Sequence, residues 1–206
     1  MINRRTVLTA GAMMTAGLLL AGLPRLAAAQ QTDPAAAFID DMAKRAIGIL
    51  QAGGAGTAQG QAEFTRILNQ GFDLPTIGRF VLGRYWNSAT PQQQQDYMQL
   101  FERMIIETYS RRFQNYQGET LVVKGTRPVG SSGDTLVGTE IRQKDGPPIQ
   151  VDWRVRQAGG SYKVVDVIVA RVSMSVTQRD EFASVIAQNG GSIDGLLQAM
   201  RQRAGG

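Results

Sequence analysis

Near residue 119 the apolar pattern of the chain changes from a helical spacing to an alternation of two residues, and this change restricts the fold more than any other feature. After it, four segments alternate like strands: residues 120–126, 135–143, 149–157 and 162–172. The intervals between them are short and rich in glycine, serine and aspartate. Because short turns of this kind join antiparallel neighbours, the pattern predicts a four-stranded antiparallel meander.

The third and fourth predicted strands differ in their patterns. In the third, one face carries Ile149, Val151, Trp153 and Val155, while the other carries Gln150, Asp152, Arg154 and Arg156. This alternation predicts a strand with one buried face and one wet or ion-paired face. The segment 164–169 is apolar almost throughout, so we expect this strand to be covered on both faces.

Helical patterns precede and follow the strands. Asp33 before Pro34 is typical of a helix start, and Thr90-Pro91-Gln92-Gln93 combines a capping side chain, a proline and a returning glutamine. The helix after Thr90 carries one apolar stripe: Tyr97, Leu100, Phe101, Met104, Ile105, Tyr109 and Phe113. Two further helices are expected before it, near residues 64–71 and 74–86, and two close the chain from about residue 175. This order predicts one α+β domain over residues 30–206, with helices packed on one face of a curved sheet.

Residues 1–29 have the pattern of a signal peptide. A short basic start at Arg4-Arg5 precedes an apolar stretch, and Ala27-Ala28-Ala29 supplies the small residues of a cleavage site. Residues 3–8 resemble the twin-arginine signal, while an ordinary secretory leader is the alternative. We therefore expect export, cleavage after Ala29 and a periplasmic protein.

Charge and composition exclude several classes of function. Three of the 22 basic residues lie in the first 29 positions, so the remainder carries a net charge near +2, and nothing argues for nucleic-acid binding. The chain has no histidine and no cysteine. Serine–histidine and cysteine–histidine catalysis and the usual zinc sites are therefore excluded, and we expect no metal, no cofactor and no enzyme.

Asp166 is the candidate for chemistry that stands out, because it lies within the apolar fourth strand. A buried carboxylate must be paired or hydrogen-bonded. Arg154 or Arg156 on the neighbouring strand could supply an ion-pair partner across the sheet. We interpret Asp166 as structural, with a catalytic acid as the alternative.

Several segments resemble the MlaC family, also called the toluene-tolerance family. They are residues 72–86, Gln99-Leu100-Phe101, Tyr109 with residues 111–113, residues 162–169, residues 172–175 and residues 179–182. The resemblance covers essentially the whole chain after the leader and consists of apolar and aromatic patterns without a catalytic signature. One departure is Ala170-Arg171, where the family pattern has an acidic residue and glycine.

The resemblance implies a curved four-stranded sheet wrapped by about six helices, in an MlaC-like, NTF2-like cone that encloses an apolar cavity. Periodicity cannot distinguish a cavity from a solid core, and composition alone favours the solid core. The implied function is that of a periplasmic phospholipid-binding carrier, not an enzyme, which shuttles lipid between outer-membrane and inner-membrane complexes and maintains the lipid asymmetry of the outer membrane. Its implied partners are an inner-membrane ABC transporter complex with a membrane-anchored capturing subunit and an outer-membrane lipoprotein complex, and we expect a monomer.

The resemblance also indicates which side chains would meet the lipid. We expect the cavity to be lined by Phe80, Tyr85, Phe101, Ile105, Tyr109, Val137, Ile141, Val151, Trp153, Val155, Val165, Val167 and Val169. Each of these residues could equally be an ordinary core residue, and the sequence offers no specific pocket for a lipid headgroup.

Three alternatives remain open. A branch related to this family is associated with hopanoid synthesis, so the ligand could be a hopanoid. A periplasmic adaptor or chaperone with an apolar groove would bind peptides and carry no lipid. An enzyme with Asp166 and a tyrosine as acid and base would need a polar cavity.

Overall fold

The computed structural model describes residues 33–54, 57–113 and 116–204, and the predicted leader at residues 1–29 lies outside them. In this described part the order is seven helices and five strands. The helices before the sheet are α1 (Pro34–Gln51), α2 (Ala58–Gly71), α3 (Leu74–Leu82), α4 (Tyr85–Ser88) and α5 (Pro91–Phe113). The strands are β1 (Thr120–Val129), β2 (Asp134–Arg142), β3 (Ile149–Ala158), β4 (Ser161–Val169) and β5 (Val172–Ser173), followed by α6 (Met174–Gln188) and α7 (Ile193–Ala204).

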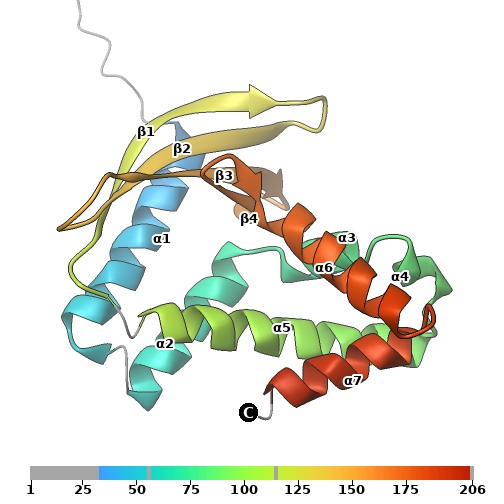
Figure 1. Ribbon diagram of the computed structural model, residues 1–206. Coiled ribbons are helices and arrows are strands. Elements are labelled where there is room, and N and C mark those ends of the chain that lie inside the picture. Colours follow the sequence, from blue (N-terminus) through green and yellow to red (C-terminus); the bar gives the residue numbers. More distant parts are fainter. Residues whose placement is uncertain (1–32, 55–56, 114–115, 205–206) are drawn as a thin grey trace, which may run out of the picture. The chain divides into compact units, whose positions relative to one another are not determined.

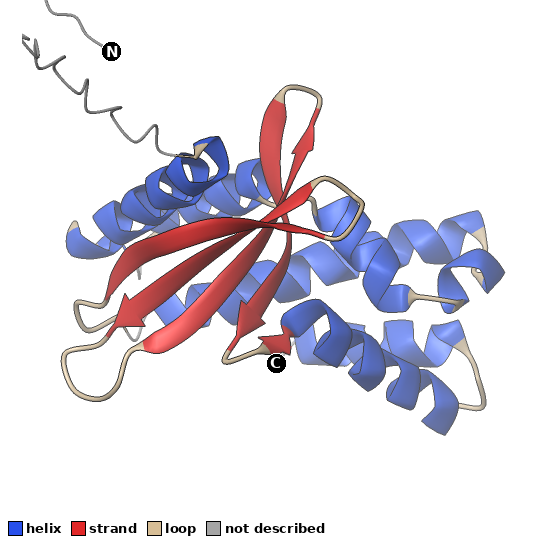
Figure 2. Ribbon diagram, turned by 90° about the horizontal axis from the view of Figure 1, so that it is seen from above, coloured by secondary structure: helices blue, strands red, loops and turns tan. Residues whose placement is uncertain are grey.

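The strands form one antiparallel meander in the order β1-β2-β3-β4-β5. The helices lie on one side of this curved sheet, which is uppermost in Figure 1 and seen from above in Figure 2. Helix α1 packs against β1 and β2, while α2, α3 and α6 contact β4. The predicted α+β class and the antiparallel meander with helices on one face are therefore confirmed.

Local chemistry explains where the two long helices begin. The Asp33 carboxylate accepts a hydrogen bond from the Ala35 backbone N–H at 2.8 Å, which starts α1. At α5 the Gln93 N–H donates to the Thr90 hydroxyl at 3.2 Å, and the Gln93 side chain accepts from the Thr90 N–H at 3.0 Å. These reciprocal bonds are the capping box that the sequence predicts.

Two element boundaries differ from the prediction. The helix expected over residues 74–86 ends at Leu82, because Gly83 adopts a φ of 59°, and a single turn, α4, follows it. The fourth predicted strand, 162–172, turns back on itself at Ala170 and Arg171, which both have positive φ. This turn creates the short strand β5, which pairs with the end of β4.

The apolar interior has two parts. A helical core joins α3, α5, α6 and α7 around Tyr97, Phe101 and Phe182, which are at most 2% exposed. A sheet core joins α1 and α2 to the inner face of the sheet around Ile39, Val137 and Val164, which are fully buried. The sheet core is filled around these residues, and a cavity begins where that filling stops.

Candidate functional site: an apolar cavity under the sheet

A cavity of about 410 Å³ lies between the inner face of the sheet and helices α1, α2 and α5. The sheet contributes mainly aliphatic side chains and one indole to its wall: Leu121, Ile141, Val151, Trp153, Val167 and Val169. Strand register explains why they face the same way, since Ile141 pairs with Ile149, Val151 with Val169, and Trp153 with Val167. The inner face of the sheet is thus apolar over three successive rows.

The helices supply the opposite wall. Along α1, Met42, Ala46 and Leu50 recur every four residues and so share one face. Ala43 lies on the same wall, and a methyl group at Ala43 or Ala46 fills far less space than a leucine would. Helix α2 adds Phe64, Ile67 and Leu68, and α5 adds Ile105 and Tyr109. The small side chains on α1 therefore leave space between the helix and the sheet.

Trp153 and Phe72 close the inner end of the cavity. The rings of these two residues meet edge to face, with centroids 6.4 Å apart. The Trp153 indole N–H donates to the Thr139 hydroxyl at 3.0 Å, and that hydroxyl donates to the Val151 carbonyl at 2.8 Å. The indole is consequently held in one orientation across the end of the cavity.

The outer end carries the polar groups of the lining. Ile149 is 37% exposed there, next to Tyr116, Glu119 and Thr120. The Glu119 carboxylate accepts a hydrogen bond from the Gln117 backbone N–H at 2.9 Å, and the Tyr116 hydroxyl donates to the Glu119 carbonyl at 3.1 Å. Among the described lining residues Glu119 is the one with an acidic or basic side chain, so the cavity is apolar inside and polar at its rim.

The structure brings some of the predicted lining residues together at this cavity. Those that line it are Ile105, Tyr109, Ile141, Val151, Trp153, Val167 and Val169. Val137 and Val155 point to the same face of the sheet but belong to the filled sheet core beyond Trp153, where they are at most 1% exposed. They lie beneath the cavity and not along its wall.

Val165 is separated from the cavity by an irregularity in the sheet. Arg154 pairs with Asp166, but Val155 pairs with Val164, so β4 has one extra residue at this point. Such a bulge shifts the alternation of side chains by one residue. Val164, Val167 and Val169 therefore face inward, and Val165 does not line the cavity.

Three of the predicted aromatic residues lie on the helical side of the molecule. Phe101 is buried in the helical core, stacked on Tyr97 with ring centroids 5.7 Å apart. Tyr85 packs against the same core, and Phe80 is 43% exposed beneath the Arg179 guanidinium. Along the apolar stripe of α5, Phe101 therefore lies in the helical core, Ile105 packs against that core and also borders the cavity, and Tyr109 lines the cavity.

Sequence reasoning missed the contribution of α1 and α2. Met42, Ala46 and Leu50 appear in the sequence as an ordinary apolar stripe, and so do Phe64 and Ile67. The signal in the sequence for this contribution is the pair Ala43 and Ala46 on the cavity side of α1. Small residues on a core-facing stripe indicate either close packing or unfilled space.

The prediction that Arg154 or Arg156 forms an ion pair with Asp166 was wrong. Arg154 and Arg156 both bind Asp134, with N–O distances of 2.7 and 2.8 Å, on the face of the sheet opposite the cavity. Burial by itself would raise the pKa of Asp134, but hydrogen bonds from Arg156 and Arg154 outweigh it and lower that pKa to about 2.

Asp166 instead organises the turn at β5. Its carboxylate accepts hydrogen bonds from the Ser173 hydroxyl at 2.7 Å, the Ser175 N–H at 3.2 Å and its neighbour Val167 N–H at 2.9 Å. These bonds tie the end of β4 to the first turn of α6. Asp166 is not among the residues that line the cavity. None of the groups hydrogen-bonded to its carboxylate is an acidic or basic side chain.

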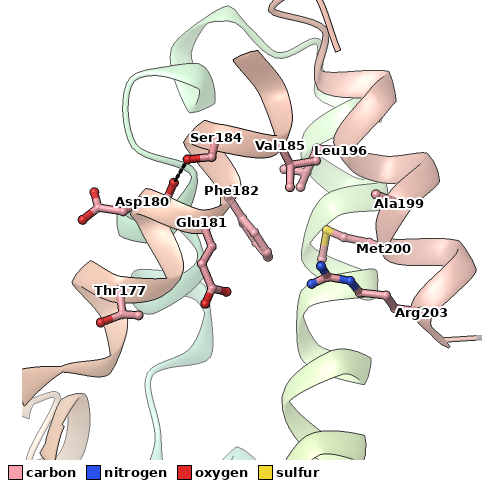
Figure 3. A pocket seen from close by; sticks show the side chains of 10 residues that line it. All are labelled: Thr177, Asp180, Glu181, Phe182, Ser184, Val185, Leu196, Ala199, Met200 and Arg203. Carbon is pink, nitrogen blue, oxygen red and sulfur yellow. Dashed lines mark hydrogen bonds between the residues drawn. The ribbon is translucent and has the colours of Figure 1, made fainter. Parts of the chain in front are cut away.

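A second hollow, of about 610 Å³, lies between α6 and α7 and is drawn in Figure 3. Its floor is apolar, with Phe182, Leu196 and Met200, but its sides carry Asp180, Glu181 and Arg203. Charged walls open to water are poorly suited to an acyl chain, since each such group would lose hydration beside it. The smaller cavity under the sheet is therefore the better candidate for an apolar ligand.

The described residues offer neither a metal site nor a membrane span. No cluster of three or more acidic residues there could hold a metal ion. Within the same residues, every helix is too short or too polar to cross a bilayer.

Comparison with known proteins agrees with this arrangement. Residues 40–202 match the family model described as MlaC protein. The chain is 26% identical over 130 residues to toluene tolerance protein ttg2D of Pseudomonas putida, a match that covers 63% of this chain and 60% of that protein. It is 27% identical over 135 residues to the intermembrane phospholipid transport system binding protein MlaC of Haemophilus influenzae, covering 64% and 62%. The chain thus spans about three fifths of the length of these relatives.

A solved structure shares the fold. A phospholipid-binding protein from Ralstonia solanacearum, in complex with a phospholipid, superposes with a TM-score of 0.72 at 24% identity. The alignment covers 83% of this chain and 97% of that one. The curved sheet with its helices is therefore a fold that this chain shares with a protein of known structure.

Proposed function

This chain belongs to the MlaC family, and from that premise we propose that it is a periplasmic phospholipid-binding carrier. It would shuttle lipid between an outer-membrane lipoprotein complex and an inner-membrane ABC transporter complex, and so maintain the lipid asymmetry of the outer membrane. The periplasmic location rests on the export signal that the sequence predicts for residues 1–29.

The cavity under the sheet is the observation that carries this proposal. It is walled by aliphatic and aromatic side chains, closed at Trp153 and Phe72, and edged by polar groups at Glu119 and Thr120. An acyl chain fits such a site because each methylene removed from water contributes about 0.8 kcal/mol. A headgroup would remain at the polar rim, where its hydration is kept.

The comparisons support the same ligand class. One relative is described as the binding protein of an intermembrane phospholipid transport system, and the solved structure with this fold holds a phospholipid. A non-catalytic role also agrees with Asp166, whose carboxylate is engaged by the β5 turn.

The energetics of the cargo imply docking partners. Two acyl chains oppose escape into water by roughly 20 kcal/mol or more, on the scale of about 0.8 kcal/mol per methylene. Release into the aqueous phase would therefore be extremely slow. The carrier must load and unload while docked to the membrane-anchored subunit of the inner-membrane complex or to the outer-membrane complex, and those partners would use the ATP.

Native mass spectrometry of the protein, exported by cells expressing the full chain and purified without detergent, tests the proposal. We expect a stoichiometric added mass that organic extraction identifies as a phospholipid. A hopanoid mass would change the ligand class. A protein that is lipid-free and stays so after incubation with labelled phospholipid vesicles would contradict the carrier and favour the adaptor.

A matched pair of variants connects the lipid to this cavity. Ile149→Asp places a carboxylate at the opening, whereas Val176→Asp places one at a comparably exposed position in the first turn of α6 that does not line the cavity. We expect Ile149→Asp to lower lipid occupancy about tenfold or more, a loss of at least about 1.4 kcal/mol. Equal occupancy in the two variants would place the lipid elsewhere.

A further inference from the structure

We infer that Trp153 is the floor of the lipid cavity and determines how long an acyl chain the protein accommodates. This inference rests on the proposed function, because it concerns the ligand of the same cavity. It goes beyond that function by assigning chain-length selection to one side chain and its two supports.

The sheet and the helices end the cavity at the same depth. On β3 the wall runs from Ile149 at the opening to Trp153, four residues or about 13 Å along a strand. On α1 it runs from Leu50 to Met42, eight residues or about 12 Å along a helix. Two elements of different geometry thus give the same cavity length.

Beyond this level the interior is filled. The next row of the sheet holds Val155 and Val164, and the preceding turn of α1 holds Ile39, all at most 1% exposed. Close packing leaves no room for a chain among these residues. An acyl chain that enters from the rim therefore meets the indole with its methyl end.

The floor is supported from two sides. Thr139 binds the indole N–H at 3.0 Å and is itself bound to the Val151 carbonyl, so the ring cannot rotate without losing a hydrogen bond. Phe72 meets the ring edge to face, and its backbone is bridged to Val164, next to the bond from the Asp73 N–H to the Val164 carbonyl at 2.9 Å. Both supports are anchored in the sheet, so the floor is rigid and does not yield to a longer chain.

A rigid floor makes chain length a determinant of affinity. Each methylene that cannot enter the cavity remains in water at the rim. The lipid then binds about fourfold more weakly than it would with that methylene buried. Removal of the indole would free the space that the ring occupies and let the chain pass toward Val155, which closes the cavity again two residues further along β3.

Tryptophan fluorescence tests the contact without altering the floor. The chain has two tryptophans, Trp86 and Trp153, so Trp86→Phe leaves Trp153 as the single emitter. The probes are two phosphatidylcholines, brominated near the methyl end or near the carbonyl end of the acyl chain. We expect the methyl-end bromine to quench Trp153 several times more strongly. Equal quenching, or stronger quenching by the carbonyl-end bromine, would overturn the inference.

A substitution tests the consequence for selection. We expect lipids extracted from Trp153→Leu to be shifted toward longer acyl chains, by two or more carbons, relative to the unsubstituted protein. Trp86→Leu, which removes the other indole from a site beside the helical core, is the matched control and should leave the distribution unchanged. An unchanged distribution in a folded Trp153→Leu would overturn the inference while lipid binding stands.

Failure of the proposed function has a different signature. If neither brominated lipid quenches and no lipid is extracted from the unsubstituted protein, the carrier itself is contradicted and the inference falls with it. If Trp153→Leu does not fold, the quenching comparison still decides, because it leaves Trp153 in place.

Discussion

Helix α5 runs through two regions that use similar side chains in different ways. Its first half places Tyr97, Leu100 and Phe101 in the helical core, where each is at most 9% exposed. Its second half places Ile105 and Tyr109 against the cavity, where they are only partly buried. Helix α1 shows a similar change along its length, since Ile39 is fully buried in the sheet core and Leu50, at the cavity, is only partly buried.

Apolar patterning therefore does not by itself produce a filled interior. In the helical core, α6 and α7 bring Phe182, Ile186, Leu196 and Leu197 against α5 from the other side. Under the sheet, the cavity-lining side chains of α1 include the small Ala43 and Ala46, which leave open space between this helix and the sheet. One region is filled by side chains from four helices, and the other leaves a cavity of about 410 Å³.

The same substitution in the two regions should have different costs, and this contrast is the largest effect we expect. Leu197→Ala in the helical core should lower the free energy of unfolding by about 3–4 kcal/mol, because a well-packed side chain leaves a cavity. Leu121→Ala at the cavity wall should cost about 1 kcal/mol, because that side chain already borders a void. Urea unfolding of the lipid-free protein measures both values, and equal costs would mean that the two regions are packed alike.

Ion pairs of Asp134 with Arg154 and Arg156 stabilise the outer face of the sheet, whereas apolar packing stabilises the helical core. Asp134→Asn should cost about 2–3 kcal/mol, since Arg154 and Arg156 lose a buried carboxylate. Hydrogen exchange should show earlier opening of β2 and β3, with α6 and α7 unchanged. Uniformly faster exchange across both regions would show that they unfold as one unit.

The pKa of Asp134 adds a pH dependence to this variant. Because folding lowers the pKa from 3.8 to about 2, the charged carboxylate stabilises the fold at pH values above about 4. That contribution is lost as the pH falls toward 2. The unsubstituted protein should therefore lose stability between pH 4 and pH 2 more steeply than Asp134→Asn, as followed by thermal unfolding at each pH.

A smaller effect is expected from the hydrogen bond inside the helical core. The buried Tyr97 hydroxyl donates to the Gly78 carbonyl at 2.9 Å, and Tyr97→Phe would leave that carbonyl without this donor. We expect a loss of about 1–2 kcal/mol in urea unfolding. A loss well below that range would mean that packing alone holds this core together.

Burial also raises the pKa of the Tyr97 hydroxyl above its ordinary value of 10.0. A raised pKa contributes stability below pH 10 that is lost as the pH rises further. Tyrosinate absorbance should show Tyr97 ionising only with alkaline unfolding, and Tyr97→Phe should remove that step from the titration.

The smallest effect on stability is expected where the hollow region is made to resemble the filled one. Ala46→Leu adds volume to the cavity wall and should change the free energy of unfolding by less than about 1 kcal/mol, in the stabilising direction. It should also reduce lipid occupancy measured by native mass spectrometry. Ala187→Leu, an exposed position on α6, is the matched control and should leave occupancy unchanged.

Much of the architecture could be predicted because its signals are local. The caps at Asp33 and Thr90, the change of period near residue 119 and the glycine-rich turns lie within a few residues of the structures they specify. The cavity could be predicted only in part. The strand residues Val151 and Trp153 follow from alternation, whereas the place of Val165 depends on a bulge that no local pattern marks.

The elements, their order and the apolar faces they present follow from the local sequence, because hydrogen bonds within helices and turns and the alternation along strands are short-range properties. Which of those faces meet closely and which enclose space depends on how distant segments pack together in the folded chain. The volume between α1 and the sheet depends on the sizes of side chains far apart in the chain, Ala46 and Val151 among them. For the same reason Asp134, and not Asp166, binds the two arginines of β3: the choice depends on which carboxylate the folded sheet places within 3 Å.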